Sequence, residues 1–79
     1  MDRTILLGHR EQTLWRIAQG AKLVAHQEEL VRRLQGAGLS TDRAQALLSA
    51  LHAAQESHKA SLARIEGELT APPPPSLEG

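Results

Sequence analysis

The sequence predicts an all-α fold, an antiparallel two-helix hairpin with coiled-coil-like packing. Leu and Ala are the commonest residues, Phe and Tyr are absent, and Trp15 is the only aromatic ring. This composition is typical of long helices rather than sheets. Apolar residues recur at helical spacing in two stretches of nearly equal length. The linker between them, residues 36–42, is short enough to favour an antiparallel arrangement.

The first helix is expected over about residues 4–35. Asp2 and Thr4 are both candidate N-caps, and the glycine at position 8 favours fraying before His9. Gly36 is the candidate for the residue that ends the helix, just after two arginines in the last turn. The apolar face is broad, and it comprises Ile17, Val24 and Val31 at its centre, Leu14 and Ala21 on one side, Gly20, Gln27 and Leu34 on the other, and Leu23 and Leu30 further round. One coiled-coil seam needs a narrower stripe, so this helix is expected to contact more than its hairpin partner.

The second helix is expected over about residues 41–69, with Ser40 or Thr41 as its cap. Its predicted apolar stripe is Ala44, Leu47, Leu51, Ala54, His58, Leu62, Ile65 and Leu69, with Leu48 and Gln55 at the margin. Residues 1–70 therefore form the hairpin. Residues 71–79 contain four consecutive prolines, which cannot continue a helix, and we expect a disordered Pro-rich tail there. A ligand for a proline-binding domain is the alternative for this segment.

Two helices share only one seam, which buries little apolar surface for a chain of this length. We therefore expect a homodimer that forms a four-helix bundle, or a protein partner that completes one. Trp15 lies off the apolar stripe. It either folds over the flank of its own helix or anchors an interface, and we take Trp15, Leu23 and Leu30 as the candidate interface.

Polar residues fall on or beside the inward faces, namely Gln27, Gln55 and His58. Seam polar residues of this kind commonly set helix register, and we expect that structural role here. Equal rise in both helices pairs positions whose numbers sum to about 77, which places Gly20 near Ser57 and His58. We expect Gly20 to make room for the imidazole, and a tolerated surface glycine is the alternative.

No sequence motif in the chain indicates a catalytic, cofactor or metal site. There is no cysteine, no nucleophile motif, and no histidine in a zinc-binding spacing. His52 and Glu56 lie four residues apart, but two ligands are too few for a metal. We therefore expect no catalytic residue, no cofactor and no metal, and a function as a non-enzymatic interaction module.

Charge and hydropathy limit the remaining function classes. Basic and acidic residues balance at nine each, which disfavours nucleic acid and anionic membranes as partners. Apolar runs are too short to span a membrane, so we expect a cytoplasmic protein. Arg32, Arg33 and Arg43 gather at the predicted hairpin tip. A small nucleic-acid-binding regulator that uses surface arginines is the alternative function.

Part of the chain resembles a group of short, uncharacterised bacterial helical proteins with the pattern E-G…I-A-R-Q-R-x-L-V, then G-H-D-T…A…L-L…F-E-x-x-Q-x-x-H-x-x-D-R-x-R-L. The residues that carry the resemblance are Gly20, residues 25–31, Leu34, Gly38, Thr41, Ala44, Leu47, Leu48, Gln55, His58 and Leu62. The family's Gly-His-Asp-Thr turn reads Gly38-Leu39-Ser40-Thr41 here. The resemblance implies a helical hairpin and a structural role for Gln27, Gln55 and His58, and it brings no activity with it.

Overall fold

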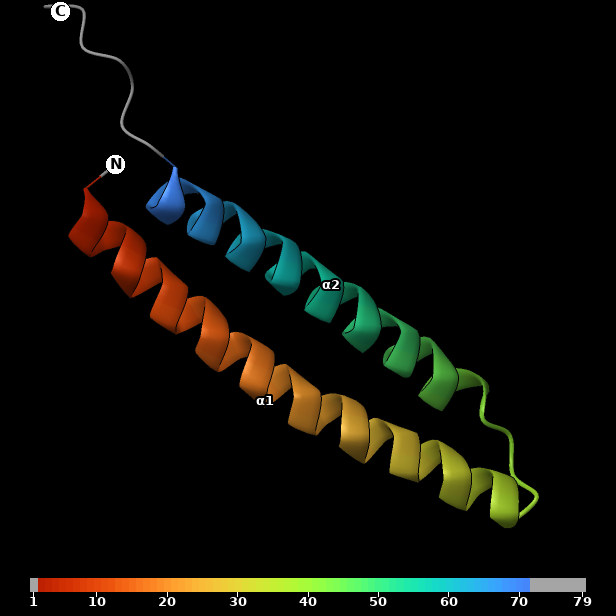
Figure 1. Ribbon diagram of the computed structural model, residues 1–79. Helices are drawn as coiled ribbons and strands as arrows, with labels where there is room; N and C mark the ends of the chain where they lie inside the picture. Colours follow the sequence, from red (N-terminus) through yellow and green to blue (C-terminus); the bar gives the residue numbers. More distant parts are fainter. Residues whose placement is uncertain (1, 72–79) are drawn as a thin grey trace, which may run out of the picture.

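The computed structural model describes residues 2–71, which form two helices joined by a short turn. Helix α1 spans Arg3–Gly36 and helix α2 spans Asp42–Thr70. The two lie side by side and antiparallel, so the start of α1 and the end of α2 meet at the same end of the molecule (Figure 1). The predicted helical hairpin is confirmed. The predicted tail lies outside the described residues from position 72 onward.

Helix α1 begins at Arg3 because Asp2 caps it. The Asp2 carboxylate Oδ1 accepts a hydrogen bond from the Thr4 backbone N–H at 3.1 Å. The helix then runs through Gly8 without a break, so the fraying expected before His9 is absent from this structure. A methyl group at Gly8 would meet nothing within 4 Å.

The turn that ends α1 is a Schellman motif centred on Gly38. The Leu39 N–H bonds the Leu34 carbonyl at 2.9 Å, and the Gly38 N–H bonds the Gln35 carbonyl at 3.0 Å. Gly38 has a φ of 71°, a left-handed conformation that glycine adopts without steric cost. The prediction that Gly36 fills this role is wrong, since Gly36 is the last helical residue and Gly38 makes the reversal.

The interface between the helices, which we call the seam, follows an alternation of three- and four-residue steps. In α1 it comprises Leu6, Arg10, Thr13, Ile17, Gly20, Val24, Gln27, Val31 and Leu34. From Thr41 and along α2 it comprises Thr41, Ala44, Leu48, Leu51, Gln55, His58, Leu62, Ile65 and Leu69. Spacing of this kind keeps one stripe of each helix facing the other over the whole length. The residue spacing of the seam is that of an antiparallel coiled coil.

The predicted stripe of α2 is wrong in its first half. Leu47 is 52% exposed and Ala54 is also exposed, whereas Leu48 and Gln55 lie in the seam. The predicted set needs two successive four-residue steps around His58, which would turn the stripe away from α1. The observed set keeps the alternation unbroken, at the cost of accepting the polar Gln55. For the same reason Leu14 lies outside the seam of α1.

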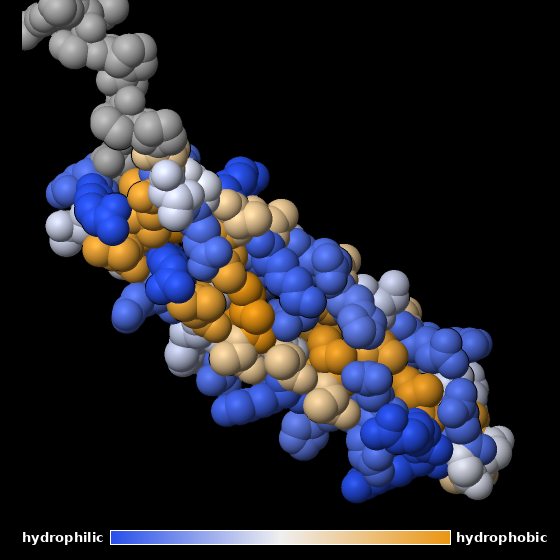
Figure 2. All heavy atoms as spheres, viewed as in Figure 1, coloured by the Kyte–Doolittle hydropathy of each residue, from blue (hydrophilic) through white to orange (hydrophobic). Residues whose placement is uncertain are grey.

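The core of the hairpin is small. Leu6, Val31 and Ala44 are its only buried apolar residues among those described, and no large side chain there is fully buried. On the face in view in Figure 2, apolar side chains form a broken band along the hairpin between polar ones. Neither described helix is long and apolar enough to cross a membrane.

Candidate functional site

The Gln55 side chain of α2 packs against Gly20 of α1 in the seam. Gln55 is 8% exposed, and its Nε2 donates a hydrogen bond to the Ile17 carbonyl at 3.0 Å. A Cβ at Gly20 would lie 2.6 Å from the Gln55 side-chain carbon Cδ, and nearer still to Oε1. The absence of a side chain at Gly20 therefore makes room for this carboxamide.

The prediction that Gly20 accommodates His58 is wrong about the occupant. The helices pair about half a turn away from the predicted register, so Gln55 rather than residues 57 and 58 reaches the glycine. Gln55 Oε1 is buried and has no hydrogen-bond partner among the described residues. A buried carbonyl oxygen without a donor is costly, which makes this site a point of reduced stability in the seam.

Gln27 makes a reciprocal contact nearer the turn. Its Nε2 donates to the Ala44 carbonyl at 2.9 Å, and the bond is buried. Gln27 thus extends from α1 to the backbone of α2, while Gln55 extends from α2 to the backbone of α1. Each bond connects one particular pair of residues, so a slip of one helix along the other would break both.

A shallow groove opens beside the seam on one side of the hairpin. It has a volume of about 300 Å³, and its walls include Trp15, Arg16 and Leu23 from α1 with Ala54 and His58 from α2. Trp15 is 63% exposed and Leu23 is 55% exposed, so both offer apolar surface to solvent at its edge. His58, which was predicted to lie in the seam together with Gln27 and Gln55, is half-buried and lines this groove.

Leu30 is the third residue of the candidate interface, and it is 43% exposed. It lies one heptad after Leu23, so both side chains project from the same flank of α1. Leu47 of α2 is exposed as well, and the sequence reasoning missed it because it assigned Leu47 to the seam. The alternation of three- and four-residue spacings stays unbroken only through Leu48, and this pattern distinguishes the seam residue Leu48 from the exposed Leu47.

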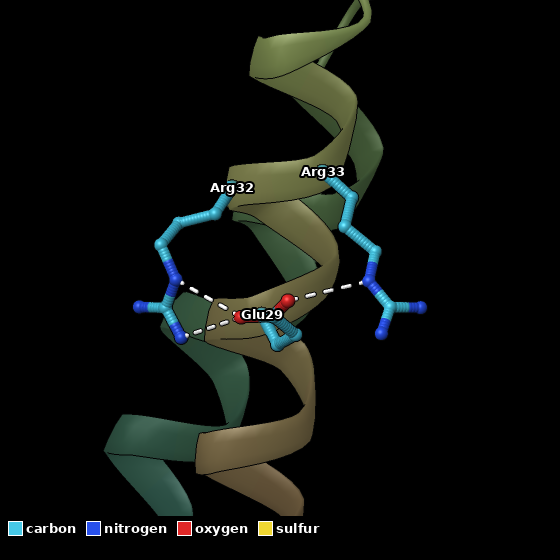
Figure 3. Close-up of polar contacts among 3 residues, drawn as sticks. All are labelled: Glu29, Arg32 and Arg33. Atoms are coloured by element: carbon cyan, nitrogen blue, oxygen red, sulfur yellow. Dashed lines mark hydrogen bonds and ion pairs between the residues drawn. The ribbon is translucent and has the colours of Figure 1, made fainter.

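Ion pairs lie on the outer surfaces of the hairpin. Glu29 accepts hydrogen bonds from Arg32 at 2.9 and 3.1 Å and from Arg33 at 3.3 Å, all within α1 (Figure 3). These bonds, from Arg32 first and then Arg33, hold the pKa of the Glu29 carboxyl below its ordinary value. One pair links the helices, Arg10 with Glu66 at 3.3 Å.

Between positions 2 and 71, His, Asp and Glu side chains nowhere gather in a group of three that could hold a metal ion. The groove beside Trp15 is open and mainly apolar, a form better suited to another helix than to a small molecule.

A scan of protein-family models and searches of curated proteins and of solved structures found no match to this chain. The resemblance to short bacterial helical proteins stays a prediction.

Proposed function

We propose that this protein is a non-enzymatic helical interaction module whose hairpins self-associate into a four-helix bundle. The contrast between its small core and its apolar surface carries the proposal. Three apolar residues are buried in the described chain, whereas eight large apolar side chains are exposed: Ile5, Leu7, Leu14, Trp15, Leu23, Leu30, Leu39 and Leu47. Scattered exposed apolar residues are ordinary on a large protein, but here they outnumber the core.

The geometry of a two-helix hairpin explains why a second layer is favoured. Each helix has one neighbour, so half or more of its circumference faces solvent in the isolated chain. A second hairpin against one flank would cover exposed leucines on both helices and give the four-helix packing found in stable bundles. Burial of leucine surface contributes about 25 cal/mol per Å², so several such side chains offset the loss of freedom on association.

The polar seam residues support this role because they fix the register between the two helices. Gln27 and Gln55 each bond a backbone carbonyl across the seam. Apolar contacts alone would tolerate a slip by one heptad, whereas these bonds would not. We infer that they hold the register that keeps the exposed leucines of α1 and α2 on a common flank. His58 belongs to the same row of the seam.

Light scattering across a hundredfold range of protein concentration, with helicity followed by circular dichroism, tests the proposal. We expect high helicity together with a mass of at least two chains that falls toward one chain on dilution. A fully helical monomer at every concentration would contradict self-association. A poorly helical monomer would contradict it as well, and would leave another protein as the source of the second layer.

A nucleic-acid-binding regulator is the second candidate, favoured by one observation. Arg16, Arg43 and Arg64 make no ion pair with another described residue, and helical geometry places them on the same flank. Binding of duplex DNA in a gel-shift or anisotropy assay should then weaken steeply as salt increases. Binding absent at low salt would exclude this candidate.

A further inference from the structure

The two flanks of the hairpin differ in charge. A residue three positions after Thr13, Gly20 or Gln27 projects to one side of the seam, and a residue one position after them projects to the other. The first side we call the basic flank; it holds Arg16, Leu23 and Leu30 of α1 and Leu47 and Ala54 of α2. The second we call the acidic flank; it holds Leu7, Leu14, Ala21 and Glu28 of α1 and Lys59 and Glu66 of α2. Two contacts agree with this division: the groove joins Leu23 to Ala54, and the ion pair joins Arg10 to Glu66.

Most of the charges that no ion pair within the described residues neutralises divide between these flanks; the others are Lys22 on the outer face of α1 and Asp2 and Arg3 at its start. Arg16, Arg43 and Arg64 lie on or at the edge of the basic flank, where Glu68 is the opposing carboxylate. Glu11, Glu28 and Asp42 lie on or at the edge of the acidic flank. The cations of the acidic flank are already engaged, Arg10 with Glu66, Lys59 with Glu56 and Arg32 with Glu29.

Each flank also carries its own apolar stripe. On the basic flank the groove lies between Leu23 of α1 and Ala54 of α2. Helical spacing extends this apolar stripe beyond the groove to the exposed Leu30 of α1 and Leu47 of α2. On the acidic flank it is a single row along α1, namely Leu7, Leu14 and Ala21, bordered by Glu11 and Glu28. One flank thus carries an apolar groove with Arg16 in its wall, and Arg43 and Arg64 lie elsewhere on the same flank. The other is an apolar helix face with carboxylates at its rim.

We propose that the acidic flank of one hairpin docks on the basic flank of the next copy, an inference that rests on the proposed self-association. The α1 row of one copy would lie in the groove of the other, with its leucines on Leu23, Leu30 and Leu47 and its carboxylates toward the arginines. A symmetric contact of basic flank on basic flank would instead oppose the unneutralised arginines of the two copies. The first contact gives a four-helix dimer. The dimer retains a free basic flank on one copy and a free acidic flank on the other, so further copies can add.

Two variants that each spoil one flank provide the test. Leu30→Glu places a carboxylate in the apolar row of the basic flank, and Leu14→Glu places one in the middle of the acidic-flank row. Both side chains are exposed, so the hairpin itself should keep its helicity by circular dichroism. Ala53→Glu, on the exposed outer face of α2, is the matched control and should associate as the wild type does.

Sedimentation velocity at a concentration where the wild type associates gives the readout. Each variant alone should be a monomer, because every contact needs one intact flank of each kind. An equimolar mixture should double in mass to a dimer of one chain of each variant, since the intact acidic flank of Leu30→Glu meets the intact basic flank of Leu14→Glu.

Other outcomes overturn the inference. If one variant alone keeps the wild-type mass while the other is monomeric, the contact is symmetric and uses a single flank. A mixture that stays monomeric, or two variants that both associate normally, contradicts the basic-to-acidic contact. These results leave the proposed self-association standing, whereas a wild type that is monomeric at every concentration removes the proposed function itself.

Discussion

The carboxamide of Gln55 occupies the space that a side chain at Gly20 would fill. Gln55 Nε2 bonds the Ile17 carbonyl one turn before the glycine, while Oε1 lies against the glycine itself without a donor. This contact lies near the middle of the seam. It also combines a requirement for a small residue with an incompletely satisfied polar group, and both have measurable consequences.

Gly20→Ala should destabilise the hairpin. The methyl group would overlap the Gln55 carboxamide, which would have to move and give up its bond to Ile17. We expect a loss of about 1–3 kcal/mol in the free energy of unfolding, measured by urea denaturation at a fixed protein concentration.

Gly8→Ala is the matched control for that substitution. It makes the same change in the same helix at a position where the methyl group meets nothing within 4 Å. It should stabilise by about 0.5–1 kcal/mol, because alanine has the higher helix propensity. Equal effects of the two substitutions would refute the close contact at Gly20.

Gln55→Met should raise stability. The thioether side chain has a similar shape and removes the buried oxygen that has no donor among the described residues. The Ile17 carbonyl loses the hydrogen bond from Gln55 but keeps its backbone hydrogen bond within α1. We expect a gain of about 1 kcal/mol in the free energy of unfolding. A loss of similar size would mean that the amide is fully satisfied in solution.

Glu29 should titrate at a lower pH than an ordinary glutamate. Arg32 and, less strongly, Arg33 stabilise its charged form, so the pKa in the folded state lies below the ordinary value of 4.5. The stability from these bonds is therefore present above pH 4.5 and is lost as the pH falls through the folded-state pKa. Carboxyl chemical shifts followed by NMR measure the titration directly.

Arg32→Gln should move the Glu29 titration back toward its ordinary value, and Arg33→Gln should move it less. The reason is that two of the hydrogen bonds come from Arg32 and one from Arg33 (Figure 3). An unchanged Glu29 titration in Arg32→Gln would show that the two side chains do not pair in solution.

Trp15 should report association through its fluorescence. It is the only aromatic residue and is 63% exposed at the edge of the groove in the isolated hairpin. Its emission should be that of a solvent-exposed indole at low concentration and shift to shorter wavelength as copies associate. Emission that stays constant while the mass increases would place Trp15 outside the interface.

Trp15→Ala separates the two interpretations of this residue. Little of the side chain is covered by its own hairpin, so helicity and stability in dilute solution should change by less than about 1 kcal/mol. Association should weaken at least severalfold if the ring contributes to the contact. A large loss of stability in the monomer would instead show that the ring packs on its own helix.

The two helices, their approximate ends and their antiparallel hairpin can be predicted from the amino-acid sequence. These features depend on local properties, namely composition, helical periodicity, an N-cap at Asp2 and a short linker, and each is readable within a few residues. The presence of Gln27 and Gln55 on the inward faces was also apparent from spacing alone, although their backbone partners were not.

Which of two adjacent apolar rows of α2 forms the seam depends on how α2 packs against α1. Leu47 and Leu48 are equally apolar, and periodicity over a short window does not separate them; the choice depends on keeping an unbroken alternation against α1 over the full length. That choice set the register, made Gln55 rather than His58 the side chain that packs on Gly20, and left Leu47 exposed on the same flank as Leu23 and Leu30. Packing between distant parts of the chain is a collective property, so it appears only once both helices are in place.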